Sequence, residues 1–440
     1  MTTTDEDLHY EVRPGRQKAL VAAAVFATLP GVLLRVAGGH PADWLAALLF
    51  GLAIIGAAFL LSWAAEVAQL DISAGLAIAL LAFIAVLPEY AVDLVFAIKG
   101  GHAFADFGHA CQSATDAAKG AESSCSLALA NMTGANRLLI GVGWSMVVFV
   151  AWWQFRRQGN RMSEVRLERS HSVELAFLSL ATLYSLTIPL KRSITLVDSA
   201  VLVLLFVAYT ARVSRAPAEE PHLVGPARWF GTFATHRRRG AVVGLFLGAA
   251  AVILLCAEHF ADALVATGAS FGVSEFFLVQ WLAPLASEAP ELLVAGVYAW
   301  RLNTNAGLGT LVSSKVNQWT LLVGTLPIAF ALASGSIHGL PIIARQREEL
   351  LLTAAQSFFA IAVLLNLSMS VREALMLFVL FWAQFVTGAV IPSNEHGKEL
   401  VWFSIAYLVI GAWFLVSQRR FATRLIRDGV RAPYAELVER

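Results

Sequence analysis

Long apolar segments separated by short polar stretches fill most of this 440-residue chain. A helix needs about 20 mostly apolar residues to cross a bilayer. Segments of this kind occur at 18–37, 43–68, 73–98, 123–153, 172–190, 194–212, 240–266, 274–300, 306–335, 349–368, 372–391 and 398–417. They lack the strict polar–apolar alternation of strands in a membrane barrel. The pattern therefore predicts an all-α polytopic membrane protein with about twelve transmembrane helices.

Composition supports this prediction and narrows the function. Hydrophobic residues make up 58% of the chain and charged residues 14%, whereas soluble domains carry about 25% charged residues. The net charge of +1 gives no reason to expect a nucleic-acid partner. The sequence shows no phosphate-binding loop, nucleophile motif or zinc-ligand spacing. We therefore expect neither an enzyme nor an ATP-driven pump, and no cofactor.

Basic residues predict the orientation in the membrane. With twelve spans, one side collects most of the arginines, namely Arg156, Arg157, Arg161, Arg166, Arg169, Arg212, Arg215, Arg228, Arg237, Arg238, Arg239, Arg419, Arg420, Arg424, Arg427 and Arg431. The positive-inside rule then places both termini and the 213–239 loop in the cytoplasm of an inner or plasma membrane. The opposite side would hold Cys111 and Cys125, either as a disulfide or as two free thiols.

Two predicted spans carry a proline–glutamate pair in an otherwise apolar segment. Pro88-Glu89 lies in the third span and Pro290-Glu291 in the eighth. A carboxylate at membrane depth is costly and indicates a functional site. Proline also leaves a backbone carbonyl without its helical partner. Because the third and eighth spans are an odd number of crossings apart, the second copy is expected to be inverted relative to the first.

The neighbouring spans repeat as well. Each pair is preceded by a span that contains an Ala-Glu step, at Glu66 and at Glu258. Each is followed by an asparagine seven residues before a glycine, at Asn136 and at Asn317. Inverted repeats are typical of secondary transporters, which bind their ions between the repeats near the bilayer midplane.

With these motifs the chain resembles the cation/Ca²⁺ exchanger superfamily of Na⁺/Ca²⁺ and H⁺/Ca²⁺ antiporters. The resemblance implies a ten-helix core of two inverted five-helix repeats, 43–212 and 240–391, joined by a cytoplasmic linker at 213–239. Residues 1–42 and 392–440 would each add one helix and a tail. The resemblance also implies that the protein's partners are the bilayer and inorganic cations. The residues it matches to the family's site are Glu89, Glu291, Ser287, Asn131, Asn136, Ser314 and Asn317.

Helical spacing adds two acidic residues to this set. Asp93 follows Glu89 by four residues, and Glu288 precedes Glu291 by three, so each pair shares a helix face. Asp93 and Glu288 are either ion ligands or residues of a water-filled cavity. Four carboxylates in a low dielectric cannot all stay ionised without positive charge nearby. Cations, protons, or the side chains of Arg137 and Lys315 could supply it; alternatively, these two long side chains extend to the membrane surface.

The sequence also departs from the family pattern. Ala85-Val86 stands where the first repeat usually has Thr-Ser, and Glu288 replaces a serine in the second. The missing hydroxyls weaken sodium sites more than the acidic site, which favours coupling to H⁺ slightly. The sequence thus predicts a Ca²⁺ antiporter driven by Na⁺ or H⁺. A monovalent Na⁺(K⁺)/H⁺ antiporter and a non-transporting ion sensor are the alternatives.

Overall fold

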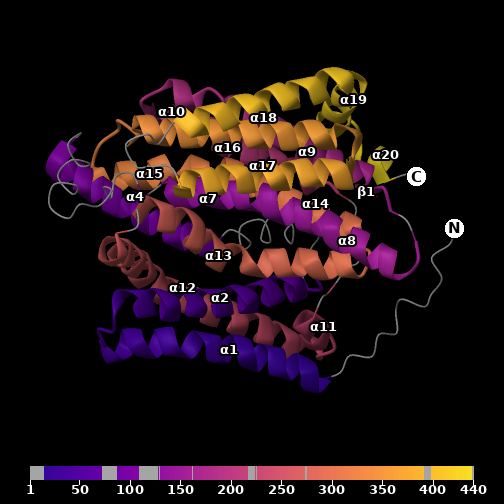
Figure 1. The fold of residues 1–440 in the computed structure, drawn as a ribbon. Coiled ribbons are helices and arrows are strands. Elements are labelled where there is room, and N and C mark those ends of the chain that lie inside the picture. Colours follow the sequence, from indigo (N-terminus) through magenta and orange to yellow (C-terminus); the bar gives the residue numbers. More distant parts are fainter. Residues whose placement is uncertain are drawn as a thin grey trace.

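The computed structural model describes residues 14–71, 87–108, 127, 129–160, 162–216, 223, 225–272, 275–390 and 398–438. Long helices run side by side in one bundle, and the first helix begins at the same end of the bundle at which the last one ends (Figure 1). The N-terminal half contains α1 (Pro14–Ala37), α2 (Asp43–Ala68), α4 (Leu87–Phe107), α7 (Ala130–Leu138), the π-helical segment η3 (Leu139–Trp144), α8 (Ser145–Arg157), η4 (Arg169–His171), α9 (Ser172–Ser185), η5 (Ile188–Leu190) and α10 (Leu196–Val213).

The C-terminal half repeats this succession of helices. It contains α11 (Pro226–Gly231), α12 (Thr235–Phe271), α13 (Glu275–Trp300), α14 (Thr304–Asn317), the π-helical segment η6 (Gln318–Leu322), α15 (Val323–Ser334), α16 (Ala344–Val363), η7 (Leu364–Asn366), α17 (Val371–Val390), α18 (Lys398–Ser417), α19 (Arg419–Val430) and α20 (Tyr434–Val438). Among the residues that the structure describes, four short strands lie between helices: β1 (Glu164–Arg166), β2 (Ser193–Ile194), β3 (Leu340–Pro341) and β4 (Ser368–Ser370).

The prediction of an all-α polytopic membrane protein is confirmed. In the described part of the chain, ten helical segments are long and apolar enough to cross a membrane, and each coincides with a predicted span. The acid-bearing helices α4 and α13 are not among these ten. The first part of the predicted span 73–98 lies outside the described residues, as do Cys111 and Cys125. The count of twelve spans therefore stays a prediction.

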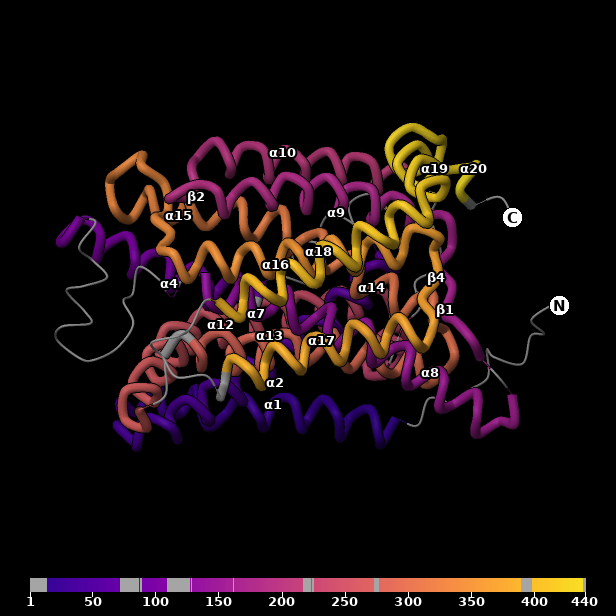
Figure 2. The backbone as a smooth tube through the Cα atoms, turned by 45° about the horizontal axis from the view of Figure 1, so that its top comes forward, coloured from indigo at the N-terminus to yellow at the C-terminus, as the bar shows by residue number. Residues whose placement is uncertain are grey.

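The packing of the two halves follows an approximate two-fold symmetry. Helices α2 and α12, which are equivalent in the two halves, pack against each other. The contact between α4 and α15 corresponds to the contact between α13 and α8. In the same way, the contact between α9 and α14 corresponds to the contact between α16 and α7. Strand β1 pairs with β4 and β2 pairs with β3, both antiparallel. The two strand pairs lie at opposite ends of the bundle (Figure 2). The second half is therefore inverted relative to the first.

Several boundaries differ from the sequence-based prediction, and the one at the end of α4 has a tertiary reason. Helix α4 continues to Phe107, beyond the predicted end at 98, and α12 begins at Thr235 rather than 240. In α4, Lys99 forms an ion pair with Asp262 of α12 and lies 3.7 Å from Glu258. Lys99, a charged residue that would end an isolated apolar span, is thus accommodated because the acidic residues of α12 lie beside it.

The connection between the halves is tied to the first half by an ion pair. Arg238 donates two hydrogen bonds of 2.8 Å to the Asp71 carboxylate, which lies just beyond the end of α2. The hydrogen bonds from Arg238, with its charge and that of Arg239, lower the pKa of Asp71 against the opposing effect of burial. Of the two arginines used to predict the cytoplasmic side, Arg238 is thus largely covered, with 16% of its side chain exposed, whereas Arg239 is 62% exposed.

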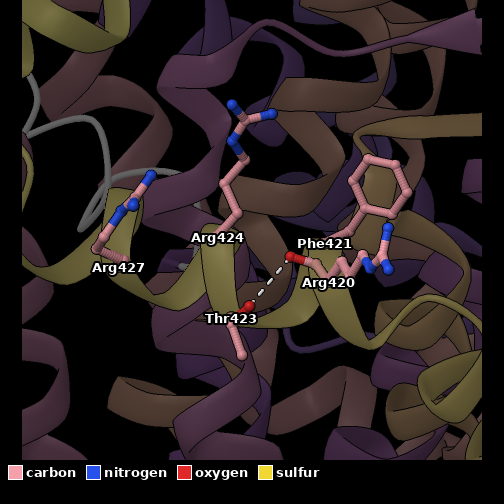
Figure 3. A pocket seen from close by; sticks show the side chains of 5 residues that line it. All are labelled: Arg420, Phe421, Thr423, Arg424 and Arg427. Atoms are coloured by element: carbon pink, nitrogen blue, oxygen red, sulfur yellow. Dashed lines mark hydrogen bonds between the residues drawn. The ribbon is translucent and has the colours of Figure 1, made fainter.

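Helix α19 follows α18 after one residue and packs against α9. Its inner side holds Asp428, which forms a 2.8 Å ion pair with Arg169. Its outer side carries a surface pocket lined by Arg420, Phe421, Thr423, Arg424 and Arg427 (Figure 3). Arg212 of α10 also donates a 3.1 Å hydrogen bond to the Gly429 carbonyl of α19. Arg169 and Arg212 therefore fix α19 to the bundle, whereas the arginines that line the pocket face outward.

Candidate cation site between the two repeats

The four predicted acids come from one helix of each repeat. Glu89 and Asp93 lie on α4, and Glu288 and Glu291 on α13. Glu89, Asp93 and Glu288 are at most 1% exposed, and Glu291 is half-buried. Helix α13 contacts α2, α12, α7 and α4 (Figure 1), so one side of it faces the interior of the bundle. The helical spacing read from the sequence thus directs all four side chains inward.

The carboxyl groups are electrostatic neighbours. Glu89 interacts with Glu291 and Asp93, and Glu288 with both Glu89 and Glu291. Even so, no group of three or more acidic, histidine or cysteine side chains in the described ranges converges closely enough to hold a metal ion. The arrangement brings the predicted acids to one region without forming a complete coordination shell.

An amide side chain holds one acid in each repeat. Asn131, one of the predicted site residues, lies on α7 and donates a 2.9 Å hydrogen bond to Asp93. Gln318, the first residue of η6, donates to Glu288. Sequence reasoning missed Gln318, although its position directly after Asn317 was a usable signal. Asn317 itself is buried.

Several oxygens of the site are buried without a hydrogen-bond donor in the described part of the chain. They are Glu89 Oε1 and Oε2, Asp93 Oδ2, Glu288 Oε2, Glu291 Oε2 and Asn131 Oδ1. Ser287 lies beside Glu89, but its hydroxyl donates to the backbone carbonyls of Ala283 (3.3 Å) and Pro284 (3.4 Å). Ser314 is buried close to Glu291. Buried acceptors of this kind are costly unless a cation or proton satisfies them.

Asn136 is not available to an ion in this arrangement. The Lys315 ammonium donates to its backbone carbonyl at 3.0 Å and to its side-chain oxygen at 2.6 Å. Lys315 also lies 4.8 Å from the centre of the Trp319 ring. Of the predicted oxygen donors, Asn136 is therefore the one whose side chain is already engaged by a positive charge.

Arg137 is buried too, and its partner was not foreseen. It forms a 2.7 Å ion pair with Glu349 on α16 and lies 5.1 Å from the centre of the Trp281 ring. Arg137 is 2% exposed and Lys315 is fully buried. The alternative in which these side chains extend to the membrane surface is therefore wrong. Neither forms an ion pair with the four acids within the described residues.

The two π-helical segments occupy equivalent places. Segment η3 follows Asn136 by three residues, and η6 follows Asn317 directly. Each continues a helix, so that Ala130–Arg157 and Thr304–Ser334 form single membrane-length segments. π-Helical turns inside α-helices often occur at functional sites. Their symmetric occurrence supports a site built from both repeats.

Inverted sets of membrane-length helices, with buried acids on the inner helix of each set, define a polytopic membrane protein of the secondary-transporter class. The chain belongs to the sodium/calcium exchanger protein family, whose sequence model matches residues 43–214 and 241–389. The resemblance seen in the two repeats is thereby confirmed.

Solved structures give a more specific likeness. The chain is 39% identical to a protein described as the H⁺/Ca²⁺ exchanger CAX, with 96% of this chain and 98% of that chain covered and a TM-score of 0.83. Native YfkE shares 15% identity over 89% of this chain and 99% of its own, with a TM-score of 0.55. At that identity YfkE shows the fold alone. None of the curated protein sequences compared with the chain matches it significantly.

Proposed function

We propose that this protein is a secondary antiporter that exchanges Ca²⁺ for H⁺ by alternating access. The observation that carries the proposal is the set of buried carboxylate oxygens on α4 and α13 that lack hydrogen-bond donors within the described residues. Such oxygens fit a substrate that is itself a cation. Both termini face the cytoplasm in this proposal, because most arginines of the loops lie on their side.

The chemistry of the site suits Ca²⁺. Calcium prefers about six to eight oxygen ligands, mostly from carboxylates, carbonyls and amides. Glu89 and Glu291 supply charge from opposite repeats, with Asp93 and Glu288 beside them. Asn131, Ser287, Ser314 and Asn317 are the additional donors we propose. A proton neutralises a carboxylate as a metal ion does, so H⁺ and Ca²⁺ compete for the same oxygens, as antiport requires.

Three observations favour H⁺ over Na⁺ as the coupling ion. The first repeat has Ala85-Val86 where hydroxyl donors are usual. Asn136, a further oxygen donor, is engaged by Lys315. The relative at 39% identity is described as an H⁺/Ca²⁺ exchanger. Fewer neutral oxygens leave fewer places for additional Na⁺ ions.

The test is ⁴⁵Ca²⁺ uptake into proteoliposomes under an imposed pH gradient or an imposed Na⁺ gradient. We expect the pH gradient to drive uptake and the Na⁺ gradient to have little effect. Glu89→Gln and Glu291→Gln should each abolish uptake, since each removes a charged ligand. The exposed Glu436→Gln is the matched control and should transport normally. Absence of pH-driven uptake in the wild type, or normal uptake in both site variants, would contradict the proposal.

A monovalent Na⁺(K⁺)/H⁺ antiporter is the second candidate. One observation favours it: the buried Lys315 charge interacts with Glu288 and so offsets part of the negative charge of the site. On this hypothesis the same proteoliposomes take up ²²Na⁺ or ⁸⁶Rb⁺ in a pH gradient without Ca²⁺. Binding of Ca²⁺ with no flux of any of these ions would instead indicate a sensor.

A further inference from the structure

A buried lysine joins the two repeats beside the candidate site. Lys315 comes from α14 of the second repeat, and its ammonium is held by two oxygens of Asn136 on α7 of the first, at 3.0 and 2.6 Å. The face of Trp319, 4.8 Å away, covers it. Carbonyl oxygens and an aromatic face are the groups with which proteins bind small cations. The surroundings of this ammonium therefore resemble a binding site for a monovalent ion.

The surrounding charges fit this description. Lys315 interacts electrostatically with Glu288 and Arg137. Arg137 is compensated by Glu349 at 2.7 Å, and Glu288 also receives a hydrogen bond from Gln318. A lysine ammonium is a compact point charge with three donors. Lys315 thus adds one positive charge at the edge of the acidic cluster, while its ammonium donates hydrogen bonds to the two oxygens of Asn136.

The repeat symmetry shows that this charge belongs to one half only. Lys315 lies two residues before Asn317, and the equivalent position before Asn136 is Gly134. A Cβ atom at Gly134 would collide with the backbone carbonyl of Gln280 on α13. No side chain of lysine size fits there. The first repeat therefore provides the oxygens, and the second provides the cation.

We propose that Lys315 is a tethered cation that fills a monovalent-cation subsite between α7 and α14. A free Na⁺ or K⁺ would need the same Asn136 oxygens, so the lysine excludes these ions from the subsite. Ca²⁺ exchange then needs no Na⁺, and the Lys315 side chain determines this ion specificity. The inference rests on the proposed Ca²⁺/H⁺ exchange and deepens it.

The test removes the tethered charge and offers a free one. In Lys315→Ala the emptied space and the Asn136 oxygens should bind Na⁺ or ethylammonium, whereas choline is too large to enter. We expect pH-driven ⁴⁵Ca²⁺ uptake by this variant to fall about tenfold or more in choline buffer and to be restored at least severalfold by Na⁺ or ethylammonium. Lys315→Arg, which keeps a charge, should show no such rescue. The exposed Lys398→Ala should behave as the wild type.

Thermal unfolding of the purified variants gives a readout that does not depend on transport. Na⁺ should raise the unfolding temperature of Lys315→Ala but not that of the wild type, because only a folded variant with a vacant subsite binds the ion. If Lys315→Ala does not fold, the uptake assay and the thermal unfolding assay are carried out on Lys315→Gln instead. A lysine that merely links the repeats would give variants insensitive to Na⁺ and ethylammonium, which overturns the inference. Failure of the wild type to take up Ca²⁺ would overturn the proposed exchange instead.

Discussion

At the scale of single residues, two buried positive charges cross the interface between the repeats. Arg137 on α7 reaches Glu349 on α16, and Lys315 on α14 reaches Asn136 on α7. Each contact joins one repeat to the other. The Arg137–Glu349 pair is nearly inaccessible, with 2% and 5% of the two side chains exposed. Removing one member of such a pair leaves a charge that water cannot reach.

Glu349→Gln should therefore lower the stability of the protein by about 3–5 kcal/mol, the usual effect of breaking a buried pair. Thermal or denaturant unfolding in detergent measures the loss. The neighbouring Glu348→Gln is a control on a half-exposed side chain and should cost less than about 1 kcal/mol. Replacing both partners with methionine should cost less than Glu349→Gln alone, since no charge is left unpaired. Equal losses in Glu349→Gln and Glu348→Gln would show that the pair contributes little.

At the scale of elements, the helices that carry chemistry are the irregular ones. Helix α13 contains Pro284 and Pro290 and yet continues from Glu275 to Trp300, so its prolines are accommodated within the helix. Segments η3 and η6 interrupt the α-helical pattern beside Asn136 and Asn317. Helix α19, by contrast, is fixed to the bundle through a charge. Burial raises the pKa of Asp428, but the hydrogen bonds and charges of Arg169 and of Arg427 together outweigh burial and lower the pKa.

The attachment of α19 should consequently depend on pH. Because the folded pKa of Asp428 lies below its unfolded value of about 3.9, the pair contributes fully above that pH and is lost as pH falls through the lowered pKa. Hydrogen–deuterium exchange of peptides from 419–430, corrected for intrinsic rates, should show α19 loosening below about pH 4. Asp428→Asn should exchange faster at neutral pH and lose this acid-dependent step. The same acid step in variant and wild type would assign it to other groups.

At the scale of the whole molecule, inversion places equivalent features at opposite ends of the bundle. The β1–β4 pair lies at the end where α1 begins and α19 lies, and the β2–β3 pair lies at the other end (Figure 2). The acids of α4 and α13 then approach from opposite repeats. The alternating access proposed above needs such an arrangement, because it relies on movement of one repeat against the other around a site between them.

Cysteine labelling tests the orientation proposed for this arrangement. In a cysteine-free background, Glu436→Cys on α20 should react with a membrane-impermeant maleimide only from the cytoplasmic side. His338→Cys, exposed near β3 at the other end, should react only from the opposite side. Labelling of both cysteines from the same side would contradict the inverted topology. If Glu436→Cys reacted only from the non-cytoplasmic side and His338→Cys only from the cytoplasmic side, the cytoplasmic placement of the termini would be contradicted.

The sequence by itself determined the class of fold and the central acids, because both follow from local patterns. Apolar length gives the membrane helices, and the repeated Pro-Glu pairs at Glu89 and Glu291 give the inverted halves. Helical spacing also placed Asp93 and Glu288 on the faces of Glu89 and Glu291, and both side chains are buried.

Only the tertiary structure decided what these side chains meet. The partners of Arg137, Lys315 and Glu288 are Glu349, Asn136 and Gln318, at positions 30 to more than 200 residues away in the chain. No periodicity encodes such distances, because they depend on how α7, α14 and α16 pack. The same holds for the length of α4, whose Lys99 needs Asp262 of α12. Spacing along the chain thus fixes which residues share a helix face, and packing of the repeats fixes which charges are neutralised.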